Sequence, residues 1–375
     1  MNNPTKYRYD ILDALRGVAA LSVLCFHLFE GIAFAAKDPT QHMFHGFLAV
    51  DFFFILSGFV MGHAYDNQWK EMSIKDFVLR RIVRLHPMVI MGAVLGLAAF
   101  ILQGCTRWDG SEVTPSTILI GFILALFLIP SPSSTDLRGN TEMFSLNGPH
   151  WSLFFEYIGS WCYALLLHRL SDKKLTFWVI SAAILLTANS IWMNEGMIAY
   201  GWSSEPLNAW GGLLRLSFGY PAGLLIARIY RKCNPQALHL PILTLTGLAL
   251  ILLLSIPHLG KAGLFYQLFC VFIAFPLIIW CGARGRIAGT GKSLARFLGE
   301  ISYPLYAIHY PLIYLYIYWI ETDSSPFGNN GWSTPIALSA IAVSVAFICY
   351  KLYDEPLRKR LSSFLKKSKK QNFFR

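Results

Sequence analysis

The chain has 375 residues, of which 55% are hydrophobic and only 14% are charged. Soluble domains carry about 25% charged residues, so this composition excludes an ordinary soluble protein and indicates an integral membrane protein. The formal net charge of +11 comes with no nucleic-acid-binding motif, and we attribute it to basic residues retained in cytoplasmic loops. The seven cysteines form no CxxC pair, so neither a zinc site nor a disulfide framework is predicted, and we expect no metal.

The first apolar run, Asp10 to Glu30, is long enough to enter a bilayer, yet it contains Asp13, Arg16 and His27. An isolated ionisable side chain in hydrocarbon costs roughly 3 kcal/mol, so such residues usually face a protein interior or a wet cavity. Arg16 and His27 are separated by almost three helical turns, which places them on one face and about 16 Å apart along the axis. We expect the function of the protein to depend on this polar stripe.

Eleven stretches are apolar enough to be considered as spans, each of which needs about 20 residues to cross. They centre on Ala20, Leu56, Leu95, Phe122, Gly159, Ala183, Phe218, Ala249, Ile273, Tyr310 and Val343. Basic residues precede the first run, follow the second, fifth, seventh and ninth, and fill the tail 358–375. This distribution predicts that both termini are cytoplasmic.

Two cytoplasmic termini require an even number of crossings, so one of the eleven runs does not cross. The weakest is Thr117 to Pro130, which is short and ends in PSPSS. We expect it to be re-entrant or packed within the outer half of the membrane. The prediction is therefore an all-α polytopic membrane protein, one domain over 1–375, with about ten transmembrane helices plus one non-crossing helix.

The loop after the second run carries a basic cluster. Ser73 and Asp76 resemble a capping box at the start of a helix, and Arg80, Arg81 and Arg84 are then neighbours on one side of that helix. Guanidinium groups at the cytoplasmic surface can hold a phosphate in a two-pronged manner. The alternative is that these charges contact anionic membrane lipid.

Later apolar runs contain further ionisable side chains, namely Asp51, Glu156, Arg215 and His309. Each has a structural alternative: an interhelical ion pair, a hydrogen-bonded core histidine, or a side chain that snorkels to the interface. Taken together with the first run, they predict a polar interior at membrane depth.

Six motifs occur in the order LDALRGVAALSVLCFH, GFLAVDFFFILSGFVM, RIVR, HWSLFFE, SYPLYAIHYPL and YDEPLRKRL. In this order they resemble the acyltransferase-3 family of integral membrane O-acyltransferases, and the similarity extends from about Tyr9 to Leu361. The resemblance implies transfer of an acyl group, usually acetyl, from cytoplasmic acyl-CoA to a hydroxyl of a carbohydrate. Expected acceptors are cell-surface or exported polysaccharide or a lipid-linked carbohydrate. The expected location is the bacterial cytoplasmic (inner) membrane, and the acyl donor is expected to be acetyl-CoA.

Some members of this family carry an additional periplasmic domain after the last span. The present sequence ends soon after its last apolar run and continues only into a basic tail, 358–375. We therefore expect a single-domain enzyme or one that works with a separate periplasmic partner.

The chemistry requires a base for the acceptor hydroxyl and a site that binds the donor phosphates. His27 is expected to be that base, because its ordinary pKa near 6.5 lets it accept a proton at physiological pH; alternatively it is transiently acylated. Arg16, oriented by Asp13, is expected to steady the donor. The phosphates of coenzyme A are expected to contact Arg81 and Arg84, with Arg80 beside them.

On the acceptor side, Trp151 and Glu156 are offset by about 140° on a helix and do not share a face. Trp151 is either an interfacial anchor or a platform for a sugar ring. Glu156 is expected to orient a histidine or to bind the acceptor, and Arg215 to contact the substrate. His309 is either a second polar residue of the lining or a structural hydrogen-bonding group.

The main alternative function is a proton-coupled transporter of a small anionic solute. In that case His27, Glu156 and His309 form a proton relay, and Arg215 meets the solute. Transporters commonly show inverted repeats with paired broken helices, and none is visible in this sequence. A purely structural protein would not explain ionisable residues in several spans.

Overall fold

The computed structural model describes residues 9–35, 45–193, 196–238, 241–257, 259–287, 291–326 and 333–373. Within these ranges the chain is helical and has no β-strand, only three isolated bridges. The helices are α1 (Asp10–Ala35), α2 (Ala49–Tyr65), α3 (Ile74–Leu102), α4 (Pro115–Leu126), α5 (His150–Leu165), α6 (Asp172–Trp192), α7 (Pro206–Cys233), α8 (Ile242–Ser255), α9 (Gly263–Phe269), α10 (Phe275–Arg284), α11 (Gly291–Ile308), α12 (Tyr310–Glu321), α13 (Ser333–Cys349) and α14 (Glu355–Phe373).

The all-α prediction is confirmed, and each of the eleven apolar runs is centred on helical residues. Two π-helical turns, Cys270–Ala274 and Tyr350–Asp354, join α9 to α10 and α13 to α14. Among the described residues, six helical segments are long and apolar enough to cross a bilayer: Asp10–Ala33, His45–Tyr65, Ile74–Leu102, Asp172–Trp192, Gly263–Arg284 and Ser333–Leu365. The count of ten crossings stays a prediction.

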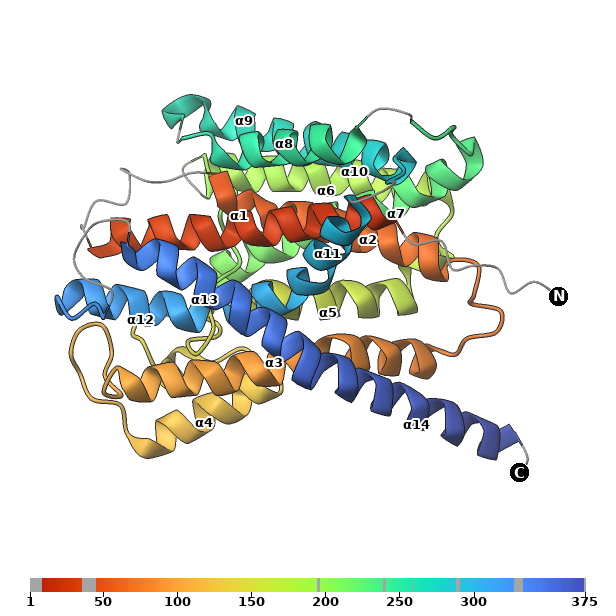
Figure 1. The fold of residues 1–375 in the computed structure, drawn as a ribbon. Helices are drawn as coiled ribbons and strands as arrows, with labels where there is room; N and C mark the ends of the chain where they lie inside the picture. The colour runs from red at the N-terminus through yellow and green to blue at the C-terminus, as the bar shows by residue number, and fades with distance from the viewer. Residues whose placement is uncertain are drawn as a thin grey trace.

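Helix α4 is 12 residues long, or about 18 Å, which is less than the thickness of about 30 Å of a bilayer core. It packs against only one half of α3, through Phe100 and Ala125 among others (Figure 1). This length agrees with the expectation that the run from Thr117 to Pro130 does not cross by itself. The other short apolar helix is α8, with 14 residues.

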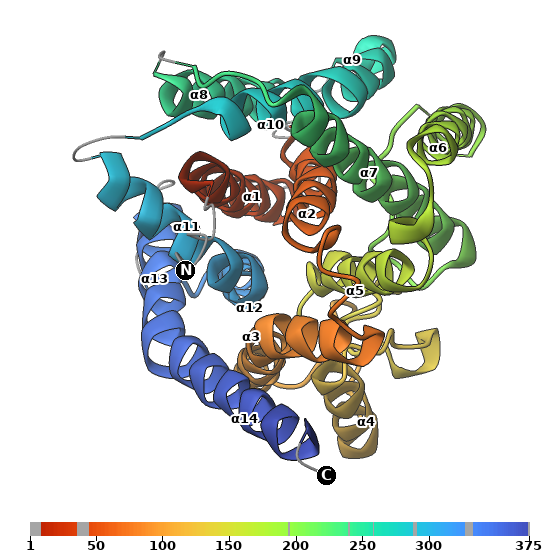
Figure 2. The ribbon, with the colours of Figure 1, turned by 90° about the vertical axis from the view of Figure 1, so that its right-hand side faces the viewer.

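The polar stripe of α1 lies inside the bundle. Helix α1 packs against α2, α8, α11 and α12, and Figure 2 shows α1, α2 and α12 surrounded by the other helices. In Figure 1, α1 begins and α14 ends toward the same side of the molecule. The side chains of Arg16 and His27 therefore face protein rather than hydrocarbon, as their charge requires.

Glycines allow α2 and α7 to approach very closely. A Cβ atom at Gly58 would lie 1.9 Å from the Tyr220 carbonyl oxygen, and one at Gly223 would lie 1.8 Å from the Ile55 carbonyl oxygen. Small residues at such crossings let two backbones touch within a membrane. This contact fixes the two helices that carry Asp51 and Arg215.

The segment between α11 and α12 is broken at His309. Pro311 has no N–H, so the Ala307 carbonyl four residues earlier loses its helical partner. That carbonyl instead accepts hydrogen bonds from Asn147 Nδ2 at 2.8 Å and His150 Nε2 at 3.1 Å. The helix break therefore fixes the start of α5 against α11.

Candidate active site

Two cavities lie within the bundle and share two lining residues, Val50 and Tyr306. The first, which we call the arginine cavity, measures about 720 Å³ with its mouth. Its polar lining includes Arg16, Ser57, Arg81, Arg84, Glu156 and Ser302. The second, the histidine chamber, measures about 1510 Å³ with its mouth. Its lining includes His27, Glu30, Glu142, Trp151, Arg215 and Tyr310.

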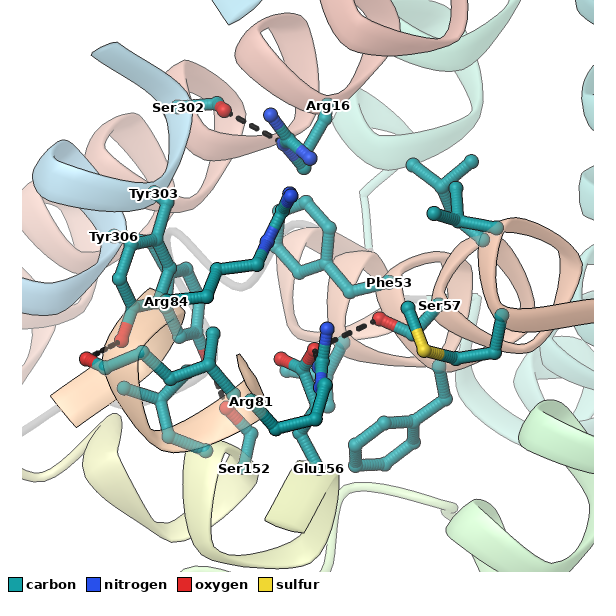
Figure 3. Close-up of a pocket in the computed structure, with 17 residues that line it drawn as sticks. Arg16, Phe53, Ser57, Arg81, Arg84, Ser152, Glu156, Ser302, Tyr303 and Tyr306 are labelled. Carbon is teal, nitrogen blue, oxygen red and sulfur yellow. Dashed lines mark hydrogen bonds and ion pairs between the residues drawn. The ribbon is translucent and has the colours of Figure 1, made fainter. Parts of the chain in front are cut away.

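Arg16 is held at the wall of the arginine cavity by α11. Its Nε donates to Ser302 Oγ at 2.7 Å and its Nη2 to the Gly299 carbonyl at 3.1 Å. Asp13 Oδ1 lies 3.4 Å from the same Nη2, so the expected contact between Asp13 and Arg16 is present. Figure 3 shows the guanidinium at the edge of the cavity.

Arg84 points into the arginine cavity toward Arg16 (Figure 3). It makes no hydrogen bond or ion pair with the residues that the structure describes. Two guanidinium groups that face one another repel, and an anion between them would remove that repulsion. The arrangement is therefore suited to an anionic ligand.

Arg81 has a different environment from Arg84, although it lies on the same helix. It is 2% exposed, and its Nη2 donates to Glu156 Oε1 at 2.6 Å. Its Nε donates to Ser160 Oγ at 3.2 Å, while Ser57 Oγ donates to the same Glu156 oxygen. The ion pair neutralises Arg81 and ties α3 to α5.

The structure therefore does not bring the three arginines together as one phosphate clamp. Arg80 is exposed and lies outside the arginine cavity, one turn closer to the start of α3 than Arg84. Arg81 forms its ion pair with Glu156. Among the described residues, the hydrogen bonds of Glu156 are to Arg81 and Ser57 rather than to a histidine. The predicted capping box at the start of this helix is confirmed.

His27 forms a close pair with Glu30 in the histidine chamber. The Nδ1 of His27 lies 2.6 Å from Glu30 Oε2, so we place the imidazole proton on Nδ1, where the carboxylate accepts it. Nε2 then keeps its lone pair and has no partner among the described residues. Glu30 was missed by the sequence reasoning, although its spacing of three residues from His27 places both side chains on neighbouring positions of the helix.

His309 packs behind His27 rather than lining either cavity within the described chain. Its ring stacks on that of His27 with centroids 5.4 Å apart, and it is fully buried. Its Nδ1 donates to the carbonyls of Leu305 and Tyr306, both at 3.0 Å. Of the two expectations for His309, the structural hydrogen-bonding group fits this geometry.

Arg215 is tied to Asp51 by two hydrogen bonds, of 3.0 Å from Nε and 2.7 Å from Nη2. Both side chains of this interhelical ion pair are at most 2% exposed. The guanidinium also lies 5.2 Å from the ring centroid of Trp151.

Trp151 lines the histidine chamber whereas Glu156 lines the arginine cavity, as their angular offset on α5 predicts. The proton relay of the transporter alternative would need Glu156 beside His27, and the structure separates them.

Glu142 is a further acidic residue of the chamber that the sequence reasoning did not identify. It lies in the loop between α4 and α5, where it accepts a hydrogen bond from the Tyr314 hydroxyl. Burial raises the pKa of the Glu142 carboxyl to about 7, because desolvation disfavours the charged form.

Among the residues that the structure describes, no group of three or more His, Cys, Asp or Glu side chains could hold a metal ion.

Comparison with known proteins gives a family and several relatives. The chain is 32% identical to protein 2 in the picA locus of Rhizobium radiobacter, over 50% of this chain and 98% of that protein. It is 24% identical to the peptidoglycan O-acetyltransferase OatA of Listeria monocytogenes, over 97% of this chain but only 58% of OatA. It is 26% identical to the putative membrane-bound transacylase BcsY of Komagataeibacter xylinus, over 82% of this chain and 73% of BcsY. No solved structure matches the chain.

The family model for the acyltransferase domain matches residues 9–351, a range that includes both cavities. The chain therefore belongs to the acyltransferase-3 family of membrane proteins and is an acyltransferase.

Proposed function

We propose that the protein transfers an acetyl group from acetyl-CoA, bound in the arginine cavity, to a hydroxyl of a carbohydrate bound in the histidine chamber. One observation carries this proposal: the two cavities meet at Val50 and Tyr306. A donor cavity with an unpaired arginine and an acceptor chamber with a histidine base thus share one boundary. Group transfer requires such proximity of two bound reactants.

The arginine cavity suits the donor because coenzyme A is rich in phosphate. Arg84 has no partner among the described residues, and forked guanidinium groups bind phosphate well. The distance from Arg16 to His27 is about 16 Å along α1. An extended pantetheine arm would follow this direction and place the thioester near Tyr306.

His27 supplies the base in the proposed reaction. Its Nε2 accepts the proton of the acceptor hydroxyl while that oxygen attacks the thioester carbonyl. The carbon–sulfur bond then breaks, and the coenzyme A thiolate takes the proton from Nε2, so no net proton is gained or lost. Glu30 stabilises the imidazolium that forms between these two steps.

An alternative route has His27 Nε2 attack the thioester, so that an acyl group resides on the ring before the acceptor hydroxyl takes it. Only this second route passes through an acyl-histidine intermediate. Incubation with radiolabelled acetyl-CoA in the absence of acceptor would leave label on the protein only in the acyl-histidine route. A His27→Gln variant is the control for nonspecific labelling.

We also propose that the arginine cavity opens toward the cytoplasm of a bacterial cell, with both termini on that side and the histidine chamber toward the periplasm. The basic stretches that follow the predicted spans support this orientation. So does the fact that α1 begins and α14 ends toward one side of the molecule (Figure 1). Labelling of introduced cysteines from either side of sealed vesicles tests it.

The proposed reaction is tested with purified protein in proteoliposomes, radiolabelled acetyl-CoA and a polysaccharide acceptor. Loss of a general base lowers the rate by about 10²- to 10⁴-fold, so His27→Ala should lose transfer to this extent and Glu30→Gln to a smaller one. Ser22→Ala is the control, because Ser22 lies on the same helix outside both cavities. Transfer at the normal rate by the His27→Ala protein would exclude both routes.

A further inference from the structure

The histidine chamber has an excess of negative charge at its surface. Two carboxyl groups, Glu30 and Glu142, line it, and Arg215 is the cation of its lining within the described chain. Arg215 is neutralised, because both oxygens of Asp51 accept its hydrogen bonds. The chamber therefore offers no unpaired cation to a ligand.

The charges behind the chamber wall do not reverse this excess. Arg138, whose charge acts on Glu142, is 2% exposed and does not line the chamber. Its Nη1 donates to Gln103 Oε1 at 2.8 Å, and its guanidinium lies 3.4 Å from the ring centroid of Tyr314. Asp136, also buried, carries the opposite charge beside it. Arg138 also attracts Glu142, but Arg138 and Asp136 add one charge of each sign, so the net charge around the chamber remains that of Glu142 and Glu30.

The remaining lining of the chamber is largely aromatic. Trp108, Trp151, Trp202, Tyr310 and Tyr314 all contribute to it. Such rings offer flat apolar faces with polar edges, which suit the apolar face of a sugar ring. Stacking of this kind requires no charge on the ligand.

We propose that the histidine chamber selects a sugar acceptor that has no anionic group near its reacting hydroxyl, and that it takes neutral or amine-bearing sugars. This rests on the proposed function, because it concerns the acceptor of that reaction. A carboxylate or sulfate in the chamber would meet like charges without a free counter-ion. At protein-interior distances of a few ångströms this repulsion corresponds to a loss in affinity of about tenfold or more.

The test compares three tetrasaccharides with the same protein in detergent: N-acetylated chitotetraose, its de-N-acetylated form, and tetragalacturonate. The comparison is made at pH 7.5, where the Glu142 carboxyl with its pKa of about 7 is mostly ionised. At this pH the first sugar is neutral, the second is partly protonated on its amines, and the third is negatively charged. Binding is measured without acetyl-CoA by the quenching of tryptophan fluorescence, and transfer is measured separately with acetyl-CoA. We expect the anionic sugar to bind at least about tenfold more weakly than the other two.

A single substitution tests the cause of this preference. Glu142→Gln removes a charge and keeps an oxygen that can accept from Tyr314, so it should raise the affinity for tetragalacturonate relative to chitotetraose. The matched control is Glu112→Gln, which removes one charge from an exposed residue outside the chamber and should leave that ratio as it is.

The outcomes separate the inference from the proposed function. Binding that favours neutral and amine-bearing sugars, without transfer, supports the inference and contradicts the proposed reaction. Transfer with equal affinity for all three sugars, or with preference for the anion, overturns the inference and leaves the reaction in place. Absence of binding by all three sugars overturns the inference as well.

Discussion

Replacement of Arg84 by alanine tests whether the arginine cavity binds the donor. Arg84 makes no hydrogen bond or ion pair with the described residues, so its removal breaks no such bond within them and should leave the fold intact. A hydrogen bond to a charged group contributes about 1.5–3 kcal/mol, and each 1.4 kcal/mol changes an equilibrium constant about tenfold. The Kd for acetyl-CoA should therefore increase about 10- to 150-fold.

The assay is calorimetric titration of acetyl-CoA into the protein in lipid nanodiscs. Arg80→Ala is the matched control, because Arg80 lies one turn earlier on the same helix and is exposed outside the cavity. An unchanged Kd in Arg84→Ala, or an equal loss in the Arg80→Ala control, would refute the assignment of the donor phosphates to this cavity.

Three further predictions concern the ion pair, the helix crossing and the chamber. Arg81→Met should lower the free energy of unfolding by up to about 3–5 kcal/mol, because it leaves the partly buried Glu156 without its ion-pair partner. Thermal unfolding of the single variants and of the double variant Arg81→Met/Glu156→Met measures this coupling, and equal unfolding temperatures would disprove it. Gly58→Ala should lower the unfolding temperature, since its Cβ would lie 1.9 Å from a backbone oxygen of α7, whereas Gly247→Ala, which has nothing within 4 Å, should not. Because the pKa of Glu142 is raised to about 7, its carboxylate forms between pH 6 and 8. The preference for chitotetraose over tetragalacturonate should therefore increase over that range, and it should increase less in Glu142→Gln, in which His27 is still present in the chamber.

The sequence predicts best those features that depend on the geometry of one helix. The periodicity of the first run places Arg16 and His27 on one face about 16 Å apart, and the structure puts them in two adjoining cavities. The angular offset of Trp151 and Glu156 on one helix likewise predicts correctly that the two side chains point in different directions, and they line different cavities. Glu30 follows the same rule and could have been found from its spacing to His27.

Pairings between helices could not be predicted in the same way. The partners of Arg81 and Glu156 depend on how α3 packs against α5, and a single sequence does not specify that contact. The three arginines are neighbours by helical spacing, yet Arg81 is buried whereas Arg80 and Arg84 are exposed, and of these two Arg84 lines the arginine cavity. Glu142 lies in an irregular loop whose path is set by long-range contacts, such as the bond of Thr141 to Ser203.

The SYPLYAIHYPL motif has its main effect on architecture rather than through its histidine. Pro311 leaves the Ala307 carbonyl free to hold the first residues of α5. As a consequence, the start of α5 lies where the cavities meet: Trp151 lines one and Ser152 the other. Ser152 also hydrogen-bonds the hydroxyl of Tyr306 at 2.5 Å, and Tyr306 lines both cavities. The helix break thus builds the boundary between the two cavities, and in the reaction proposed above the acyl group passes this boundary beside Tyr306.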